Sequence, residues 1–352
     1  MDVELLELDD PRWPALLTRL RHGVDHLPTA LAAYDAFRGH SSQLLVVQDA
    51  EGVLAVPLRL LVGPGDSVHA TSSEVRSSPI FSEGATARWR RGAIRELLDF
   101  LQSRGVVTLF LRLHPLLDPV GADFAPFGAI VDHGPTFDIP LDRPLAEIRA
   151  GMRVNHQRGI RKFHNQGLHC EPDTEWRYLE QFHRLYSLTM DRVGASDDYR
   201  FSLEFFEQLR DNLGEHLALW ATIVDGQLAV GHLVAQCEGI AELLYVGVHP
   251  DYQRQVPQVG LYDSELAWAP EHGLHDYFLD GGAQESLRHF KAGLTKVQPA
   301  ASSVRIVVDP VEYGRRCALW ERSPERVVGR ADEFFPPYLQ PATKVASEPA
   351  HV

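Results

Sequence analysis

The stretch YVGVHPDYQRQVPQVGLYDSELAWAPEHGLHDYFLDGGAQESLRHFKAGL, residues 245–294, decides the fold class of this chain. Its apolar spacing predicts a strand, a loop, a helix that ends at Gly273, a second strand and a further helix that contains His289–Lys291. The second strand ends at Asp280–Gly282, where glycines let the backbone turn sharply or approach a ligand. This alternation of strands and helices is typical of an α/β fold.

The same architecture is predicted twice along the chain. A turn-rich segment at Asp132–Pro135 separates the two halves, and Asp225-Gly226 between apolar runs predicts a tight hairpin in the second half. In the first half the predicted strands are Val3–Leu8, Gln43–Gln48, Val53–Leu61 and Val106–Leu113, and the helix is Thr86–Arg104. In the second half the strands are Thr136–Leu141, Leu217–Val224, Gln227–Gln236, Ile240–Val248, Tyr277–Asp280 and Ser302–Val308, and the helices are Leu145–Asn165, Thr174–Val193, Phe201–Leu213, Leu261–His272 and Gln284–Leu294.

Two domains are expected, because 352 residues exceed what one core usually supports. We predict an N-terminal domain at residues 1–135 and a C-terminal domain at residues 136–322, each a mixed, largely antiparallel sheet flanked by helices. Residues 323–352 are rich in proline, alanine and charge, which indicates a surface-draped or mobile tail.

Composition narrows the possible partners and the compartment. A formal net charge of −14 disfavours indiscriminate binding of polyanions such as DNA, so any nucleic-acid contact must be local. The acidic start does not resemble a secretory signal, and no apolar run reaches the roughly 18 residues of a membrane helix. We therefore expect a cytoplasmic protein without membrane insertion.

The three cysteines, Cys170, Cys237 and Cys317, are far apart in the sequence and form no CxxC pair. This spacing argues against a disulfide framework and against a zinc site. We expect packing roles for these cysteines and no metal. The sequence also lacks HExxH, GxSxG, GxxxxGK[ST] and a GxGxxG after a strand, which disfavours metalloproteases, serine hydrolases, P-loop NTPases and Rossmann enzymes.

Residues 245–294 resemble the C-terminal acyltransferase half of the FemAB-like branch of the GNAT superfamily. The stretch RAGMRVNHQRGIRKFHNQG at 149–167 resembles the basic helix that opens that half, and VTLFLRLHPL at 107–116 resembles the strand that closes the first half. The resemblance covers residues 1 to about 320 as a pattern. It implies two tandem GNAT-like domains, with the chemistry in the C-terminal one.

Lys291 is the predicted catalytic cation. Attack of an amine on an ester or thioester carbonyl builds negative charge on oxygen, and a cation at that place lowers the barrier. The resemblance implies that Lys291 and Phe290 lie near the reacting carbonyl. Helical spacing puts Gln284, Arg288 and Lys291 on one face beside Gly282, so these residues are predicted to bind substrate. The alternative is an ordinary solvated helix face.

The general base is left open among three residues. Asp280 lies at a strand end, and Glu242 and His232 lie on neighbouring predicted strands, so each is a candidate to take the amine proton. Asp280 is counted among the predicted catalytic residues, and the identity of the base stays open. Each also has a structural alternative, because a histidine on a strand is commonly a hydrogen-bonded core residue. Tyr245 is predicted to line the substrate cleft by its strand position.

The segment Arg149–His164 is basic and contains no acidic residue, an exception in an acidic chain. Taken as one helix, it places Arg149, Arg153 and His156 on one face and a second group of cations on another. Such a helix is predicted to contact tRNA phosphates. The alternative is a solvated helix whose cations pair with acidic neighbours. The residues predicted to bind tRNA are Arg149, Arg153, Arg158, Arg161 and Lys162.

The loop Gln253–Gly260 stands where an acetyl-CoA-dependent GNAT domain carries a glycine-rich loop that cradles the pyrophosphate. Here the glycines are largely replaced, and Pro257 has no amide hydrogen. This departure weakens the case for CoA, and the resemblance to FemAB-like proteins implies aminoacyl-tRNA instead. No further cofactor is expected.

Arg112 and His114 are predicted to bind the amine acceptor, because ligand clefts in α/β sheets open at the ends of strands. An arginine there can grip a carboxylate or phosphate, and its alternative role is an interdomain ion pair.

Our first functional hypothesis is an aminoacyl transferase that moves an amino acid from aminoacyl-tRNA to the amine of a small molecule or peptidoglycan precursor, forming an amide bond. The second is an N-acyltransferase that uses acyl-CoA or a carrier-protein thioester. The third is a noncatalytic binding protein, in which replacing Lys291 leaves function intact.

Overall fold

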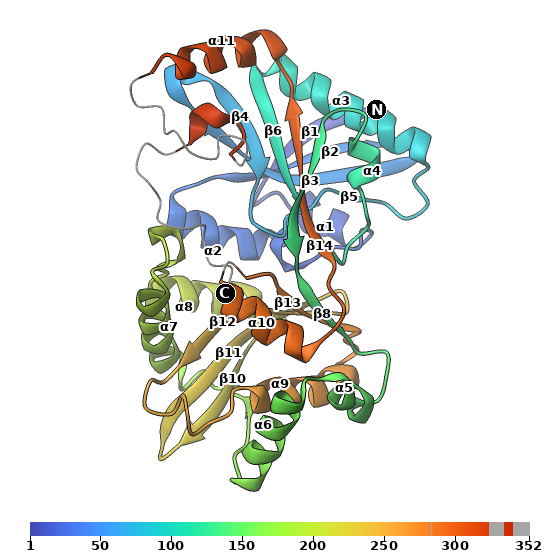
Figure 1. Ribbon diagram of the computed structural model, residues 1–352. Helices are drawn as coiled ribbons and strands as arrows, with labels where there is room; N and C mark the ends of the chain where they lie inside the picture. Colours follow the sequence, from blue (N-terminus) through green and yellow to red (C-terminus); the bar gives the residue numbers. More distant parts are fainter. Residues whose placement is uncertain (283, 324–333, 341–352) are drawn as a thin grey trace. The chain divides into compact units, whose positions relative to one another are not determined.

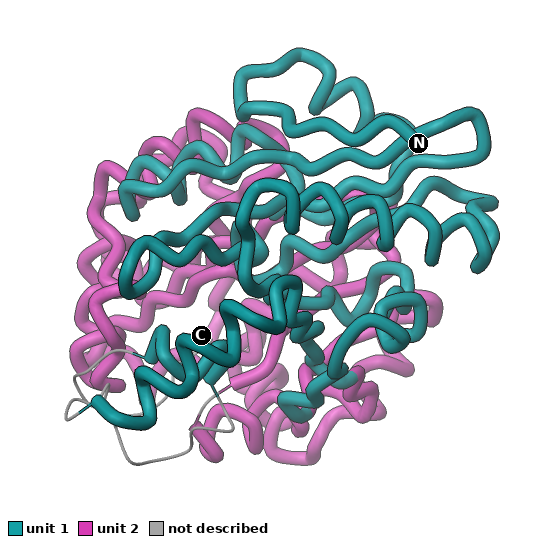
Figure 2. Tube along the Cα trace, turned by 90° about the horizontal axis from the view of Figure 1, so that it is seen from above, with its two compact units in different colours: residues 1–134, 300–347 teal, residues 135–299, 348–352 magenta. Residues whose placement is uncertain are grey.

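Two units, each built on its own β-sheet, make up the chain (Figure 2). The computed structural model describes residues 1–282, 284–323 and 334–340. Unit 1 consists of residues 1–134 and the described residues from 300 onward, and unit 2 consists of residues 135–299. Both sheets are mixed and flanked by helices, so the predicted fold class is confirmed.

The sheet of unit 1 has the strand order β1-β2-β3-β4-β6-β14-β7, with β5 added against β3 (Figure 1). Strands β1 to β4 form an antiparallel meander, and β4 pairs with β6 in parallel. The strands are β1 (Asp2–Glu7), β2 (Ser42–Asp49), β3 (Gly52–Val62), β4 (Val68–Ser72), β5 (Ile80–Phe81), β6 (Val106–Leu113), β7 (Ala129–Pro135) and β14 (Ala300–Val307). The helices are α1 (Arg12–Leu17), α2 (Pro28–Arg38), α3 (Ala87–Ser103), α4 (Gly121–Phe124) and α11 (Pro310–Glu321).

Helices cover both faces of this sheet. Residues Leu44–Val47 of β2 are all fully buried, which requires cover on both sides because successive side chains of a strand point to opposite faces. Ile94 and Leu97 of α3 belong to the cluster that covers one face. The predicted helix Thr86–Arg104 is confirmed as α3, whose first turn is capped by the Thr86 hydroxyl, which accepts from the Trp89 amide at 3.2 Å.

β14 and α11 belong to unit 1, which differs from the predicted C-terminal domain of residues 136–322. β14 runs antiparallel to β6, from Ser302 opposite Leu113 to Val307 opposite Thr108. Its apolar residues Val304 and Ile306 are buried in the same cluster as the apolar residues of β6. The unit therefore completes its sheet with a strand from the far end of the chain, a long-range pairing that local patterns do not indicate.

The described part of the predicted tail, Phe334–Gln340, packs on unit 1. Tyr338 is 6% exposed, and its ring lies 5.4 Å from that of His69 on β4 and 6.0 Å from that of Tyr313 on α11. A Cβ on Gly63 would come within 2.7 Å of the Leu339 side chain. Tyr338 and Pro336 of this segment are buried, and residues 324–333 and 341–352 of the predicted tail lie outside the described residues.

The sheet of unit 2 has the strand order β8-β13-β12-β11-β10-β9; of the strand pairs described in it, β12 with β13 is parallel and the others are antiparallel. The strands are β8 (Phe137–Pro140), β9 (Glu171–Pro172), β10 (Leu217–Val224), β11 (Gln227–Cys237), β12 (Ile240–Val248) and β13 (Asp276–Asp280). The helices are α5 (Leu145–Gly151), α6 (Val154–Asn165), α7 (Leu179–Val193), α8 (Leu203–Leu213), α9 (Val259–Trp268) and α10 (Glu285–Leu294). No helix in the described part of the chain is long and apolar enough to span a membrane.

The predicted hairpin of unit 2 is confirmed. β10 and β11 meet with Val224 opposite Gln227, and the two turn residues between them, Asp225 and Gly226, have φ values of 52° and 77°. Two successive positive φ angles are what a tight hairpin turn requires, and Asp-Gly adopts them at little cost.

One predicted helix, Leu145–Asn165, is instead two helices, α5 and α6. The chain is extended at Met152 and Arg153, and the Arg153 amide donates to the Gly293 carbonyl at 2.7 Å rather than to a carbonyl of its own helix. Arg149 and Arg153 are therefore not on one helical face with His156, which corrects that prediction.

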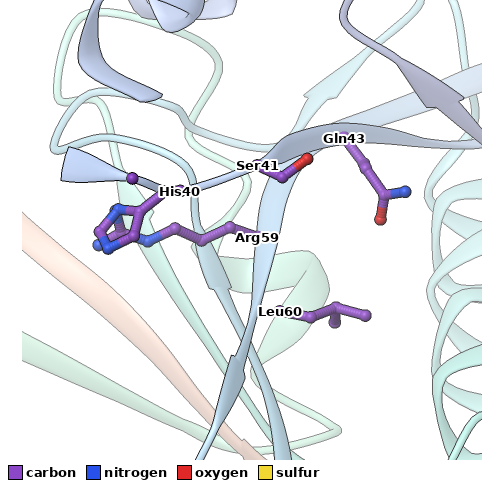
Figure 3. Close-up of a pocket in the computed structure, with 6 residues that line it drawn as sticks. His40, Ser41, Gln43, Arg59 and Leu60 are labelled. Carbon is purple, nitrogen blue, oxygen red and sulfur yellow. The ribbon is translucent and has the colours of Figure 1, made fainter. Parts of the chain in front are cut away.

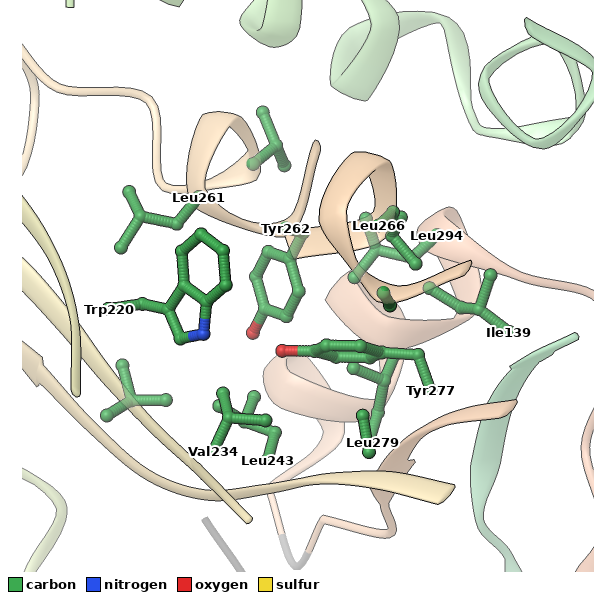
Figure 4. Close-up of a cluster of buried hydrophobic side chains, with 14 of the residues drawn as sticks. Ile139, Trp220, Val234, Leu243, Leu261, Tyr262, Leu266, Tyr277, Leu279 and Leu294 are labelled. Atoms are coloured by element: carbon green, nitrogen blue, oxygen red, sulfur yellow. The ribbon is translucent and has the colours of Figure 1, made fainter. Parts of the chain in front are cut away.

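An apolar core fills the space between the sheet of unit 2 and α9 (Figure 4). Trp220, Leu243 and Leu279 come from the strands, and Tyr262 comes from α9. Two tyrosines, Tyr262 and Tyr277, point their hydroxyl groups into this core, so it contains polar atoms that need partners.

Candidate functional site

The end of β13 forms a tight turn that leads to α10. Asp280, the last residue of the strand, has a φ of 59°, in the left-handed region that L residues seldom adopt. Its Oδ1 accepts a hydrogen bond from the Gly281 amide at 2.7 Å, which stabilises this conformation. Strained backbone of this kind concentrates at functional sites.

Two cations of α10 bind the backbone of this turn. Lys291 is 1% exposed, and its ammonium donates to the carbonyl oxygen of Leu279 at 2.6 Å and to that of Gly281. The Arg288 guanidinium donates to the Gly282 carbonyl at 2.7 Å. Lysine is almost never fully buried without partners that stabilise its charge. The structure thus brings Asp280, Gly282, Arg288 and Lys291 together, while Gln284 is the exposed N-cap residue of α10.

Phe290, next to Lys291, packs inward against unit 2. Its ring centroid lies 4.8 Å from that of His156 and 5.9 Å from that of Tyr262. The His156 ring also bonds the Phe290 carbonyl through Nε2 at 2.9 Å. A Cβ on Gly293 would lie 2.6 Å from that nitrogen, so α6 and α10 are in close contact. Phe290 therefore links the basic segment to the helix of Lys291.

β12 and β13 diverge beside this turn. Their parallel pairing covers only three residue pairs, from Ile240 opposite Asp276 to Glu242 opposite Phe278. β12 continues to Val248 and β13 to Asp280 with no further pairing between them, although both strands are described throughout. In this stretch the Leu279 carbonyl of β13 accepts from Lys291, and β12 is buried throughout.

Some cations of the basic segment Arg149–His164 have partners within unit 2. The Arg149 guanidinium holds both oxygens of the buried Asp263 on α9, at 2.5 and 2.8 Å, and His164 Nε2 lies 2.8 Å from the same carboxylate. Arg153 contacts His289, and Lys162 Nζ donates to the Arg254 carbonyl at 3.3 Å.

The outer face of α6 carries the remaining cations. Arg158, Arg161 and Lys162 are exposed, whereas His156, Ile160 and Phe163 on the opposite face are buried. Within the described residues, neither Arg158 nor Arg161 forms an ion pair. We call Arg158, Arg161 and Lys162 the α6 cation face.

The inner face of α6 covers the beginning of α9. A Cβ on Gly159 would lie 2.6 Å from Val259, and a Cβ on Gly260 would approach three ring atoms of Phe163 to less than 3.0 Å. The Gly260 amide donates to the Pro257 carbonyl at 2.9 Å, and the Leu261 amide donates to the Gln258 carbonyl at 3.0 Å. The start of α9 is thus packed against Phe163, and two of its first amides already have partners.

Unit 2 is similar to a known protein family. Residues 150–292 match the family described as acetyltransferase (GNAT) domain. Unit 2 has a GNAT-like fold. The resemblance to the FemAB-like branch is confirmed at the level of the fold, because the chain superimposes on FemX with a TM-score of 0.69 at 13% identity, over 89% of this chain and 99% of FemX.

Two further solved structures have a similar fold. A conserved protein of unknown function from Bacteroides thetaiotaomicron matches with a TM-score of 0.56 at 10% identity, over 79% of this chain and 89% of that one. The C-terminal domain of a protein from Agrobacterium fabrum, provisionally named a lysylphosphatidylglycerol synthetase, matches with a TM-score of 0.54 at 12% identity, over 86% and 92%. A search of curated proteins found no match.

Tyr245 belongs to an aromatic cluster of unit 2. Its ring centroid lies 5.4 Å from that of Tyr186 on α7, and 5.3 and 5.4 Å from those of Phe201 and Phe206. Tyr245 is 7% exposed. The structure therefore shows it packing β12 against α7 and the α8 region, and its predicted contact with substrate stays a prediction.

His232 lies in a buried polar network of the same unit, as its structural alternative expected. Its Nδ1 is 2.9 Å from Glu265 Oε1, and the Tyr277 hydroxyl donates to Glu265 Oε2 at 2.5 Å. All three side chains are at most 1% exposed. Burial and the neighbouring Glu265 raise the pKa of Tyr277. This network satisfies His232 Nδ1 and the Tyr277 hydroxyl, whereas His232 Nε2 is buried without a hydrogen-bond partner among the described residues.

A carboxyl group that sequence analysis missed lies in the same sheet. Asp138 on β8 stands opposite Phe278 on β13, which in turn stands opposite Glu242 on β12. Asp138 and Glu242 are 2% and 1% exposed. Burial, together with the nearby Asp276 carboxylate, raises the pKa of Asp138 to about 7. The signal in the sequence was a single aspartate inside the apolar strand Phe137–Pro140.

The predicted acceptor residues lie in unit 1. Arg112 on β6 donates its amide to the Ser72 hydroxyl at 2.9 Å, and its guanidinium lies 5.8 Å from the centre of the Phe110 ring. His114 is 3% exposed, and its Nδ1 accepts from the Leu116 amide at 3.1 Å. Arg112 thus remains partly accessible, whereas His114 is enclosed in unit 1.

Proposed function

We propose that this chain is an aminoacyl transferase that takes an amino acid from aminoacyl-tRNA and joins it to the amine of an acceptor, forming an amide bond. The main support for the proposal is that the two faces of α6 have different roles. Its inner face covers the start of α9, where CoA-dependent GNAT domains hold the pyrophosphate, and its outer face presents the α6 cation face.

The contacts made at the beginning of α9 disfavour the usual mode of CoA binding. A pyrophosphate at a helix N-terminus needs free amides and room for close approach of the backbone. Phe163 takes the space above Gly260, and the amides of Gly260 and Leu261 are used inside the turn. A donor that binds elsewhere on the domain avoids both obstacles.

The α6 cation face suits the backbone of a tRNA acceptor arm. Three cations lie within two turns of one helix, and α6 contains no acidic residue. Each phosphate contact adds affinity that falls with salt concentration. The remaining cations of the segment have partners in unit 2, so we restrict the predicted tRNA contacts to Arg158, Arg161 and Lys162.

In the proposed reaction, the acceptor amine attacks the ester carbonyl of the aminoacyl-tRNA. A C–N bond forms, the bond from the carbonyl carbon to the tRNA 3′-terminal oxygen breaks, and the amine proton passes to that leaving oxygen. The tetrahedral intermediate carries a negative oxygen. To stabilise it, the Lys291 ammonium gives up its hydrogen bond to one of the two turn carbonyls and donates to the oxyanion instead.

Binding of total tRNA to the purified chain, measured by filter retention at several salt concentrations, tests the proposal. We expect saturable binding that weakens at least about tenfold when Arg158, Arg161 and Lys162 are all replaced by Gln. The matched control replaces three other exposed cations of unit 2, Arg177, Arg192 and Lys296, by Gln. Equal loss in both triple variants would contradict a specific role for α6.

The second candidate is an N-acyltransferase that uses acyl-CoA, which the description of the matched family favours. Calorimetry with acetyl-CoA separates the two. Saturable heat from acetyl-CoA without tRNA binding would replace the first proposal by the second.

A further inference from the structure

Unit 1 has a hollow of about 280 Å³ between the end of α2 and β3. Four of its six lining residues have polar side chains. Gly39, His40, Ser41, Gln43, Arg59 and Leu60 line it. Figure 3 shows the Arg59 side chain running toward the imidazole ring of His40. We call this feature the Arg59 hollow.

Arg59 is a partly buried cation without a carboxylate partner among the described residues. One of its terminal nitrogens contacts His40 Nδ1, which is uncharged when it accepts a hydrogen bond. Its Nε is enclosed and has no hydrogen-bond partner in the described part of the chain. Burial lowers the pKa of Arg59, which means that the site penalises its charge. A cation placed in this way gains from an anion that enters the hollow.

The charges around Arg59 leave one positive charge in excess. The groups that interact with it electrostatically are Arg38, Arg112, Asp35 and Glu74. Both carboxylates have other partners: Glu74 is paired with Arg38, and Asp35 bonds the amide and hydroxyl of Ser42 at 2.6 and 3.0 Å. Among the described residues, Arg59 and Arg112 therefore have no carboxylate paired with them.

We propose that the Arg59 hollow binds the anionic group, a carboxylate or a phosphate, of the molecule that serves as the amine acceptor. A guanidinium presents several N–H donors in a plane, which matches both oxyanions. Gln43 and Ser41 add neutral polar groups to the wall. The assignment of the anion to the acceptor rests on the proposed function, because the donor is proposed to bind unit 2.

Calorimetry of the full chain tests the proposal with two simple probes, inorganic phosphate and acetate, at constant ionic strength and pH 7.5. We expect saturable binding of at least one probe by the unaltered protein. Binding of phosphate alone indicates a phosphorylated acceptor, and binding of acetate alone indicates a carboxylate. Absence of saturable binding for both probes would overturn the proposal, and this result needs no variant.

Two variants locate the binding. Arg59→Gln is expected to weaken it about ten- to hundredfold, because a charge-assisted hydrogen bond is lost. Arg88→Gln, which removes an exposed arginine from α3 in the same unit, is the matched control and is expected to leave binding unchanged. Equal affinity of Arg59→Gln and the unaltered chain would place the anion elsewhere and overturn the assignment.

The outcome is separable from that of the proposed function. The titration contains no tRNA and no acyl donor, so a failure of aminoacyl transfer would leave anion binding intact. Conversely, loss of the Arg59 site would leave tRNA binding by α6 unchanged.

Discussion

Phe163 lies directly over Gly260, so closely that a side chain at position 260 has no room. The aromatic ring comes from α6 and the glycine from the first turn of α9. This contact joins the helix that carries the exposed cations to the helix whose start holds CoA in related domains. This one packing contact therefore affects both candidate donor sites, the proposed tRNA site on α6 and the alternative CoA site at the start of α9.

Gly260→Ala is expected to destabilise the protein. The new methyl group would overlap the Phe163 ring, and overpacking of this kind costs about 1–3 kcal/mol. Chemical denaturation measures the change. The control is Gly151→Ala, where a Cβ meets nothing within 4 Å and a change of less than about 1 kcal/mol is expected. Equal stabilities of the two variants would show that α6 does not pack on α9 as described.

Lys291→Met is expected to lower the transfer of amino acids from charged tRNA to an acceptor amine at least about 100-fold, the loss typical of an oxyanion contact. Methionine keeps much of the volume and removes the charge. A matched variant, Lys296→Met, alters an exposed lysine of the same unit and should retain activity. A decrease of less than about tenfold, with the fold intact by circular dichroism, would support the noncatalytic alternative instead.

Asp138→Asn is expected to flatten the dependence of stability on pH. The pKa of Asp138 is about 7 in the folded chain and 3.8 for an ordinary aspartate, so between these values the folded state keeps a proton that the unfolded state has lost. Stability from this group is complete below about pH 4 and declines as pH rises to 7, by at most about 4 kcal/mol. The Asn variant cannot lose that proton.

Urea unfolding at several pH values measures this effect. Asp142→Asn, which changes an exposed aspartate, is the control and should follow the unaltered protein. Parallel curves for Asp138→Asn and the unaltered protein would show that Asp138 titrates as an ordinary carboxyl group.

Asp263→Asn is expected to cost about 1–3 kcal/mol of unfolding free energy, because the buried carboxylate holds both Arg149 and His164. Glu180→Gln provides the contrast. Glu180 pairs with Arg184 on the surface of α7, where both side chains are more than half exposed, and a change below about 0.5 kcal/mol is expected. Similar values for the two variants would mean that Asp263 contributes no more than a surface ion pair.

Local signals in the sequence predicted much of unit 2. Asp225-Gly226 set the hairpin of β10 and β11, and the apolar spacing of residues 245–294 placed α9, β13 and α10. The same signals placed Lys291 and Arg288 beside the β13 turn. They did not predict that Lys291 is enclosed, because its partners are backbone carbonyls that any residue can supply.

Long-range contacts account for what sequence analysis missed. α5 and α6 separate because the Arg153 amide bonds Gly293, a residue distant in sequence. β14 joins unit 1 because its pairing with β6 is likewise distant. The Arg59 hollow depends on charges that come together only in the folded unit. No local pattern reports such contacts.

The donor is the central claim, and release of labelled amino acids from a charged total tRNA pool, with a small-molecule cell extract added as the source of the acceptor amine, tests it most directly. We expect the purified chain to accelerate this release, to favour some of the amino acids over others, and to lose the acceleration in the triple variant of Arg158, Arg161 and Lys162. A rate equal to that of charged tRNA with the extract but without the protein, for every amino acid, would contradict an aminoacyl-tRNA donor.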